Sequence, residues 1–466
     1  MNKLYETINY EKLWSPSGDV FADAGGYALK YLSERYPDKD ILELIEYATD
    51  IYVNKWGGKL NSFFLNSTIT QPAFKGDKKK TETKNYFLSL LNENYPNIDG
   101  VCRILGIKTK LFSAGRNNSI LTGSGTFVNF HHHFEDGMML SKEALIRLYF
   151  LPLATEMLTG RLCVVSSSNS VISELFSYDC CERNFANIAQ NVSEGVLMNP
   201  SKNPSTAIFR FLDKILLKIG YNCTGFINLY YFTNFGASPD LQIYTLPFEA
   251  FDFYRETQKS ENKDTWQRFV SAYYKKPTEF KKADFNNKTL TFNVLEKKEE
   301  RVVNESEYKY WTNTIYQNLI NQKSILPHIL KWSINNSFNI NLVKCYLYNI
   351  IKMKKETIDK IMTLADFVVD NTKEADLKNV LTKLNGIKSS SLLRKFLLKI
   401  VERNFQNGNS GPIITVQDYT EYLFPEDNFW KEIRDVLLIA IYQRLHEKAI
   451  KVEDIEIINE FEDDED

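Results

Sequence analysis

The sequence contains little histidine and little cysteine: five and six of its 466 residues. No two cysteines form a CxxC pair and their spacing fits no disulfide framework, so we expect reduced, mostly buried thiols. Phosphate-binding GxxxxGK[ST] loops, G-x-S-x-G elbows and HExxH helices are also absent. We find no catalytic constellation in the sequence, and we expect no cofactor.

Long apolar runs are missing as well. No stretch of about 18 apolar residues occurs, so we expect no membrane span. The first residues, MNKLYETINYEKLW, lack the apolar core of a secretion signal, and we therefore expect a cytoplasmic protein. Hydrophobic content of 43% and charged content of 25% are typical of a globular chain, and the length suits two or three domains.

Three of the five histidines are consecutive, in the segment NFHHHFEDG. In an extended backbone His131 and His133 share one face while His132 points to the other, which is poor geometry for one metal ion. We therefore favour a polar surface loop. A metal-dependent nuclease centred on His131–Asp136 stays open as an alternative, because acids follow the histidines directly.

The net charge of −2 conceals an uneven distribution. The last segment, EDIEIINEFEDDED (453–466), carries nine acids and no base, so the rest of the chain has a net charge of about +7. We interpret this tail as a disordered, solubilising end. The alternative is that it imitates nucleic acid and screens a basic face. Basic residues concentrate in KGDKKKTETK (75–84), which we interpret as a mobile loop, and in the helical segment LLRKFLLKIVER (392–403).

The pattern of apolar residues predicts an α+β protein. To about residue 305, helical segments such as 41–52, with Asp40 as its cap, mix with strands such as RLCVVSS (161–167). Residues 98–140 form a loop-rich module within this domain, with short β-runs at 110–112 and 126–130. From 306 to 452 nearly every segment has helical periodicity, which predicts a bundle. The acidic tail, 453–466, follows it.

The segment SGDVFADAGGYAL contains two carboxylates, Asp19 and Asp23, and one interpretation of them is a metal pair. Gly25 and Gly26 favour a structural explanation. We expect these glycines to permit close backbone packing, and we expect Asp23 to cap the helix that begins nearby.

The same stretch, GDVFADAGGYALKYL, resembles the opening of the large subunits of type I-B CRISPR interference complexes (Cascade), in the branch named for its CXXC–CXXC motif. Those subunits have a first CxxC, then Pro-Leu-Thr-Gly-Ser and Asn-Phe, then a second CxxC that opens a helix. Leu-Pro-Leu and a Gly-Arg-Leu strand follow. This chain has Cys102, then ILTGSGTFVNF, then DGMMLSKEALIRLYFLPLATEMLTGRLCVVSSS. The resemblance covers residues 19–168, and the helical C-terminal half agrees in layout.

The family's zinc ligands are mostly lost. Cys102 stands at the first CxxC, but Leu105, Ser141 and Ala144 occupy the other three positions. Tetrahedral zinc needs four ligands, so we expect no metal and interpret residues 98–140 as a degenerate zinc-finger-like module.

The resemblance implies a non-catalytic large subunit of an antiviral defence complex. Such subunits bind near the 5′ handle of the CRISPR RNA (crRNA), recognise the protospacer-adjacent motif (PAM) in double-stranded target DNA, support R-loop formation, and help to recruit a helicase-nuclease. Their C-terminal helical domain resembles the small subunit and follows the displaced single strand. The implied partners are therefore crRNA, double-stranded target DNA and its displaced single strand, the backbone and other Cascade subunits, and the helicase-nuclease, with no membrane. The alternative is a helical protein-binding scaffold without a nucleic-acid role.

This function calls for cations that neutralise phosphates and for amides that fit base edges or the backbone. We expect the bundle cations to lie near one flank of their helix. The candidate nucleic-acid-binding residues are Lys78, Lys79, Lys80 and Lys84 in the basic segment; Arg116, Asn117 and Asn118 in the module; and Lys388, Arg394, Lys395, Lys399 and Arg403 in the bundle.

Overall fold

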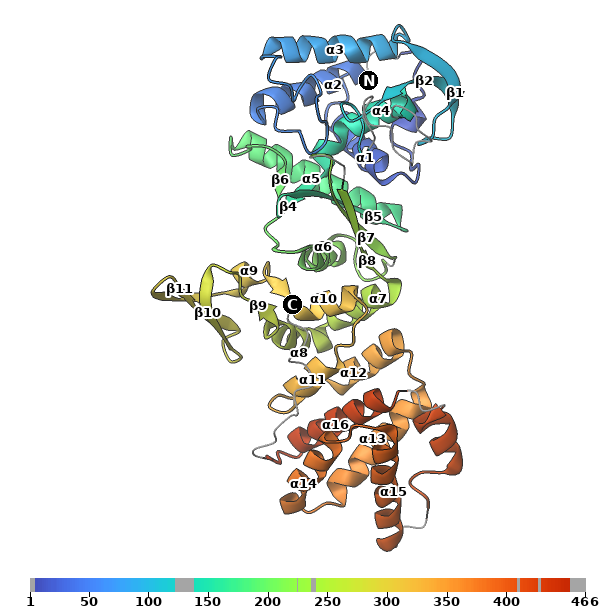
Figure 1. The fold of residues 1–466 in the computed structure, drawn as a ribbon, viewed down its shortest axis with the longest axis vertical. Helices are drawn as coiled ribbons and strands as arrows, with labels where there is room; N and C mark the ends of the chain where they lie inside the picture. Colours follow the sequence, from blue (N-terminus) through green and yellow to red (C-terminus); the bar gives the residue numbers. More distant parts are fainter. Residues whose placement is uncertain are drawn as a thin grey trace. The chain divides into compact units, whose positions relative to one another are not determined.

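The structure is a computed structural model that describes residues 5–121, 138–223, 225–235, 240–408, 411–425 and 429–452. The histidine segment 131–136 and the acidic tail lie outside the described residues. The protein is α+β, as predicted, with sheets and loops in its N-terminal region and a largely helical C-terminal region (Figure 1). The chain divides into two compact units, residues 1–248 with 309–312 and residues 249–308 with 313–466.

The first long helix, α1 (Val20–Arg35), begins at Asp19. The Asp19 side chain accepts a hydrogen bond from the backbone nitrogen of Ala22 at 2.8 Å, so Asp19 is the N-cap. The expectation that Asp23 caps this helix was wrong. Asp23 lies in the first turn, where its carboxylate accepts hydrogen bonds from the backbone nitrogens of Ser17 (2.8 Å) and Gly18 (3.0 Å).

The two glycines of α1 allow close contact with α4 (Lys142–Phe150), as predicted. A Cβ atom on Gly25 would lie 1.9 Å from the carbonyl oxygen of Arg147, so no other residue fits there. The Arg147 side chain is fully buried, donates from Nε to the carbonyl oxygen of Ala22 at 2.8 Å, and pairs with Asp23. Burial lowers the pKa of Arg147, and the carboxylate of Asp23 opposes that shift.

Helix α2 (Ile41–Asp50) starts at the predicted cap, which is a capping box between Asp40 and Glu43. A π-helix, Ile51–Lys55, continues it. The next helix corrects the prediction of a mobile loop at residues 75–84, because α3 spans Asp77–Leu91. Lys and Glu are good helix formers, and the buried side chains of Thr83 and Phe87 give this charged segment an inward face.

The degenerate module contains a three-stranded antiparallel sheet in the order β1 (Asn97–Val101), β2 (Lys108–Ala114) and β3 (Met138–Ser141). The β-run predicted at 110–112 is confirmed within β2. The run predicted at 126–130 lies outside the described residues.

A five-stranded sheet with the order β6-β4-β5-β7-β8 forms the middle of the first unit. The predicted buried strand is confirmed as β5, whose Leu162, Cys163 and Val164 are all buried. Helix α5 packs on β5, and α6 contacts β7 and β8 (Figure 1). The elements are η4 (Leu151–Ala154), β4 (Glu156–Leu158), β5 (Arg161–Ser167), α5 (Ser170–Ala189), β6 (Leu197–Met198), α6 (Pro204–Lys218), β7 (Ile227–Thr233) and β8 (Asp240–Leu246).

The second unit opens with helices that pack around aromatic residues and with a small antiparallel sheet, β10-β11-β12. The boundary predicted between residues 305 and 306 falls inside this unit, since Tyr308 donates from its hydroxyl to the carbonyl oxygen of Leu290 at 3.0 Å. The elements are α7 (Phe248–Thr257), α8 (Ser260–Ser271), β9 (Tyr274–Lys275), β10 (Phe280–Asn286), β11 (Thr291–Glu296), β12 (Glu299–Val303), α9 (Glu305–Tyr308), β13 (Thr312–Asn313), α10 (Thr314–Ile320), α11 (Leu326–Ser333) and α12 (Ile340–Tyr346).

The last part of this unit is helical: η5 (Leu347–Ile351), α13 (Lys355–Asp370), α14 (Glu374–Asn385), α15 (Ser390–Gln406), η6 (Asp418–Leu423) and α16 (Trp430–Glu447) (Figure 1). Helix α16 is buried along most of its length and packs against α11, α13, α14 and α15. It therefore forms the core around which the others gather. No helix in the described ranges has the length and apolar character needed to cross a membrane.

Candidate nucleic-acid interface

The basic cluster predicted in the N-terminal region lies on α3, and three of its four lysines are held by neighbouring groups. Lys79 donates to the carbonyl oxygen of Ile69. Lys80 pairs with Asp50 at 2.5 Å, and Lys84 pairs with Glu46, which raises the pKa of Lys84. Lys78 is exposed, with its ammonium 5.1 Å from the centre of the Phe74 ring. Since exposed ion pairs are weak, phosphates could replace these partners, but the cluster is not a set of free cations.

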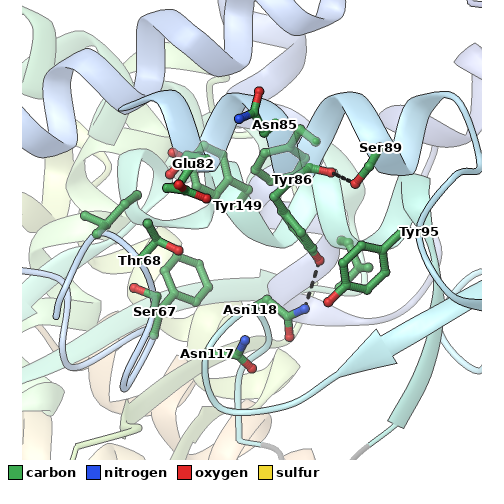
Figure 2. A pocket seen from close by; sticks show the side chains of 15 residues that line it. Ser67, Thr68, Glu82, Asn85, Tyr86, Ser89, Tyr95, Asn117, Asn118 and Tyr149 are labelled. Atoms are coloured by element: carbon green, nitrogen blue, oxygen red, sulfur yellow. Dashed lines mark hydrogen bonds between the residues drawn. The ribbon is translucent and has the colours of Figure 1, made fainter. Parts of the chain in front are cut away.

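The first unit also contains a cavity of about 440 Å³ beside α3 (Figure 2). Predicted residues Asn117 and Asn118 lie at this cavity, opposite the aromatic side chains of α3. Its wall combines tyrosines, phenylalanines and small polar side chains. The lining residues are Phe64, Ser67, Thr68, Ile69, Glu82, Thr83, Asn85, Tyr86, Phe87, Ser89, Tyr95, Asn117, Asn118, Leu145 and Tyr149.

Asn118 holds the shape of this cavity. Its Nδ2 donates to the Tyr86 hydroxyl at 2.9 Å and to the Ser113 carbonyl oxygen at 3.1 Å, and its Oδ1 accepts from the Gly115 backbone nitrogen at 2.8 Å (Figure 2). Burial raises the pKa of Tyr86, and the hydrogen bond from Asn118 offsets part of that shift. Because both Nδ2 and Oδ1 of Asn118 are hydrogen-bonded within the protein, its side chain has a structural role.

The other two residues of this predicted group differ from each other. Arg116 donates from Nη2 to the carbonyl oxygen of Asn234 at 2.5 Å, and its own carbonyl accepts from the Leu65 backbone nitrogen at 2.7 Å. Arg116 therefore joins three segments of the first unit. Asn117 is exposed at the cavity, and of the three it is the one placed to contact a ligand.

A second hollow, of about 430 Å³, lies between α13, α14 and α15; we name it the bundle groove. Apolar side chains form its floor and four cations lie among its lining residues. The apolar lining is Phe367, Val368, Val380, Ile387, Leu392, Phe396 and Ile400, and the cations are Lys383, Lys395, Lys399 and Arg403.

The cations of the bundle groove are less engaged than those of α3. Lys395, Lys399 and Arg403 follow one another at intervals of four residues on α15, which places them along one face. Arg403 donates to the hydroxyl of Thr372 at 3.0 Å. Within the described part of the chain, Lys383, Lys395 and Lys399 have no ion-pair partner, and no acid lines the groove.

The structure separates Arg394 from these residues, which corrects the prediction of a single flank. The Arg394 guanidinium lies over the rings of Phe424, at 5.0 Å, and Tyr419, at 5.8 Å. Adjacent residues of a helix point about 100° apart, so Arg394 and Lys395 cannot share one narrow stripe. Lys388 is exposed before the start of α15 and does not line the groove.

Lys383 was missed by sequence analysis. It lies on α14, outside the cation-rich segment of α15, and residues of both helices line the groove. Lys383 follows Val380 by three residues, so both lie on one face of α14. Helical periodicity alone does not show which other helix that face meets.

Cys102 and Ser141 occupy two of the four positions at which the resembling subunits have zinc ligands, and they lie close together. The backbone nitrogen of Cys102 donates to the carbonyl oxygen of Ile107 (2.9 Å), and Gly106, with a φ of 67°, closes the turn by donating to the carbonyl oxygen of Cys102 (2.8 Å). The backbone nitrogen of Ser141 donates to Cys102 Sγ at 3.4 Å, so both halves of the motif meet. Only one thiol is present, and the residues do not fit zinc. Across the described ranges, no group of three or more His, Cys, Asp or Glu residues could hold a metal.

One known family is similar to the region that contains the bundle groove. A family model described as the DevT C-terminal domain matches residues 331–466, which include every residue of the groove. The match covers less than a third of the chain. No curated protein and no solved structure matched the sequence.

Proposed function

We propose that this protein is a non-catalytic large subunit of a type I-B CRISPR RNA-guided DNA surveillance complex. It binds near the 5′ handle of the crRNA, recognises the PAM in target duplex DNA, supports R-loop formation and helps to recruit the helicase-nuclease. Two resemblances in separate parts of the chain support this proposal. Residues 19–168 resemble such subunits, and residues 331–466 match the C-terminal domain of DevT, a CRISPR-associated protein related to type I-B systems.

The observation that carries the proposal is the composition of the bundle groove. Surfaces that bind single strands without reading sequence combine a cationic track with aromatic side chains on which bases stack. Phe367 and Phe396 lie among the apolar lining, and Lys395 and Lys399 stand one helical turn apart beside them. On this proposal the groove follows the displaced strand, while the cavity beside Asn117 faces the target duplex or the RNA handle.

The groove is tested in the full chain by the double substitution Lys395→Glu and Lys399→Glu. Binding of a labelled single strand should weaken at low salt, and the slope of log K against log salt should become shallower by about 1.4, because two phosphate contacts are lost. The double substitution Lys373→Glu and Lys388→Glu is the matched control, since both lysines are exposed but do not line the groove. Equal losses in the control and the groove variant, or no loss in either, would reject the groove as an interface.

The wider assignment is tested by co-expression with the neighbouring genes and a CRISPR RNA. We expect an RNA-containing complex that binds target duplexes carrying one short motif more tightly than duplexes without it. A complex of proteins alone would instead favour the helical scaffold. Cleavage of DNA by the isolated chain with a divalent ion, lost on substitution of residues 131–136, would favour the nuclease alternative.

A further inference from the structure

The bundle groove and the end of the chain have complementary chemistry. The groove combines an apolar floor with four cations, and its lining contains no acid among the described residues. The tail, 453–466, carries nine acids and no base, together with Ile455, Ile457, Ile458 and Phe461. Acids interspersed with apolar side chains are the composition that such a groove would hold.

We infer that the acidic tail docks in the bundle groove of its own chain and, if the proposed function holds, competes there with the nucleic-acid strand. Contacts at the end of α13 place the origin of the tail near the groove. Lys448, just after α16, pairs with Asp370, the last residue of α13. Two residues further, Thr372 accepts the hydrogen bond from Arg403 at the groove.

The length of the tail suffices for this contact. Fourteen extended residues span up to about 46 Å. The three cations of α15 occupy only about 12 Å of helix, at 1.5 Å per residue. The tail is therefore several times longer than the row of cations that it would cover.

Tethering determines how strongly the tail can compete. A short flexible segment has an effective concentration in the millimolar range at a site it can reach. A weak contact with a dissociation constant somewhat below that concentration would be occupied most of the time. We therefore expect the tail to lower the affinity for a single strand by about three- to tenfold, and salt to weaken tail and strand together.

Docking is tested directly on the unmodified full chain without nucleic acid. A carbodiimide joins carboxylates to lysines that they touch, and mass spectrometry locates the new amide bonds. We expect tail carboxylates joined to Lys383, Lys395 or Lys399, and not to the exposed lysines Lys373 and Lys388 outside the groove. A mixture of isotope-labelled and unlabelled protein distinguishes bonds within a chain from bonds between chains. Bonds only to lysines outside the groove, or only between chains, would overturn the inference.

Competition is tested in the full chain by replacing all nine acids of the tail with Asn or Gln (E453Q, D454N, E456Q, E460Q, E462Q, D463N, D464N, E465Q and D466N). Affinity for a labelled single strand should rise three- to tenfold, as estimated for the tethered tail. The rise should vanish when Lys395→Glu and Lys399→Glu are also present. If tail carboxylates are cross-linked to groove lysines but strand binding is unchanged in these variants, the docked tail is retained and the groove is rejected as a nucleic-acid site. If the groove binds the strand but no cross-links join the tail to groove lysines, the docked tail is rejected and the proposed function is retained.

Discussion

The backbone nitrogen of Ser141 donates a hydrogen bond to the thiol sulfur of Cys102, at 3.4 Å and across 39 residues of sequence. These residues occupy positions at which the resembling subunits have zinc-binding cysteines. In this chain an amide-to-sulfur hydrogen bond and buried packing join the two halves of the module. The hydrogen bond and the packing hold the two halves of the module together with one thiol present.

Protein purified without a histidine tag should therefore contain no stoichiometric zinc. Leu105, Ser141 and Ala144 supply no thiolate, and one cysteine cannot hold a tetrahedral ion. Elemental analysis by mass spectrometry checks this. The triple variant Leu105→Cys, Ser141→Cys, Ala144→Cys is the positive control and should take up about one zinc. One zinc per chain in the unmodified protein would contradict the prediction.

Removing the carboxylate that pairs with Arg147 should destabilise the first unit. In Asp23→Ala the buried guanidinium loses its charged partner, which typically costs about 3 kcal/mol or more of unfolding free energy. Denaturant unfolding measures the change. Asp19→Asn is the matched control, because Asn caps helices about as well as Asp and should leave stability nearly unchanged. Equal effects of the two substitutions would show that the Asp23–Arg147 pair has no special importance.

Asn117 and Asn118 are adjacent but should behave differently. Asn118→Ala removes three hydrogen bonds that organise the loop and should lower the melting temperature, at a cost of about 2 kcal/mol. Asn117→Ala should leave the melting temperature unchanged and, in the assembled complex, reduce discrimination between correct and incorrect target motifs. Competition binding with the two duplexes measures that discrimination. A destabilised Asn117 variant with intact discrimination would be the opposite result.

Stability of the second unit should depend on His328. Burial lowers the pKa of His328 to about 4 from its ordinary 6.5, and the nearby charges of Lys331 and Lys275 contribute. Between these values the unfolded state binds the proton more readily, so the contribution is full above about pH 6.5 and falls as the pH drops towards 4. In His328→Phe this dependence should flatten. Parallel unfolding curves of both proteins across this range would contradict the prediction.

A fragment that starts at Glu249 should fold better than one that starts at Glu305. Phe269 packs edge-to-face on Phe338, with ring centres 5.2 Å apart, and on Trp332 at 6.1 Å. The shorter fragment lacks Phe269 and exposes both partners. Thermal melts followed by circular dichroism should give a cooperative, higher transition for residues 249–466 than for residues 305–466. Identical transitions would show that the earlier segment contributes nothing.

The sequence predicted the fold class and the helical C-terminal region, because helical periodicity is a local property that burial on one face imposes. The prediction of helices failed where a high content of charged residues obscured the helical periodicity. Residues 75–84 are so rich in lysine that they suggested a loop, although Thr83 and Phe87 face inward. The prediction also named Asp23 as the cap of α1 where the structure has Asp19, because only the backbone geometry shows which of the two carboxylates is the cap.

The candidate site was predicted less well, because a site depends on which faces meet. Lys395, Lys399 and Arg403 share a helix, and their common face followed from their spacing. Lys383 and the apolar floor come from other helices, so no local pattern joins them to α15. Arg394 was misplaced because its partners, Phe424 and Tyr419, lie more than twenty residues away in sequence.

The contact between α1 and α4 also sets an order of events during synthesis. Asp23 and Arg147 are 124 residues apart, so α1 leaves the ribosome long before its partner exists. At roughly 5–20 residues per second, α1 waits for about 6–25 seconds. During that time its apolar face, closely fitted at Gly25, has no native surface to cover it.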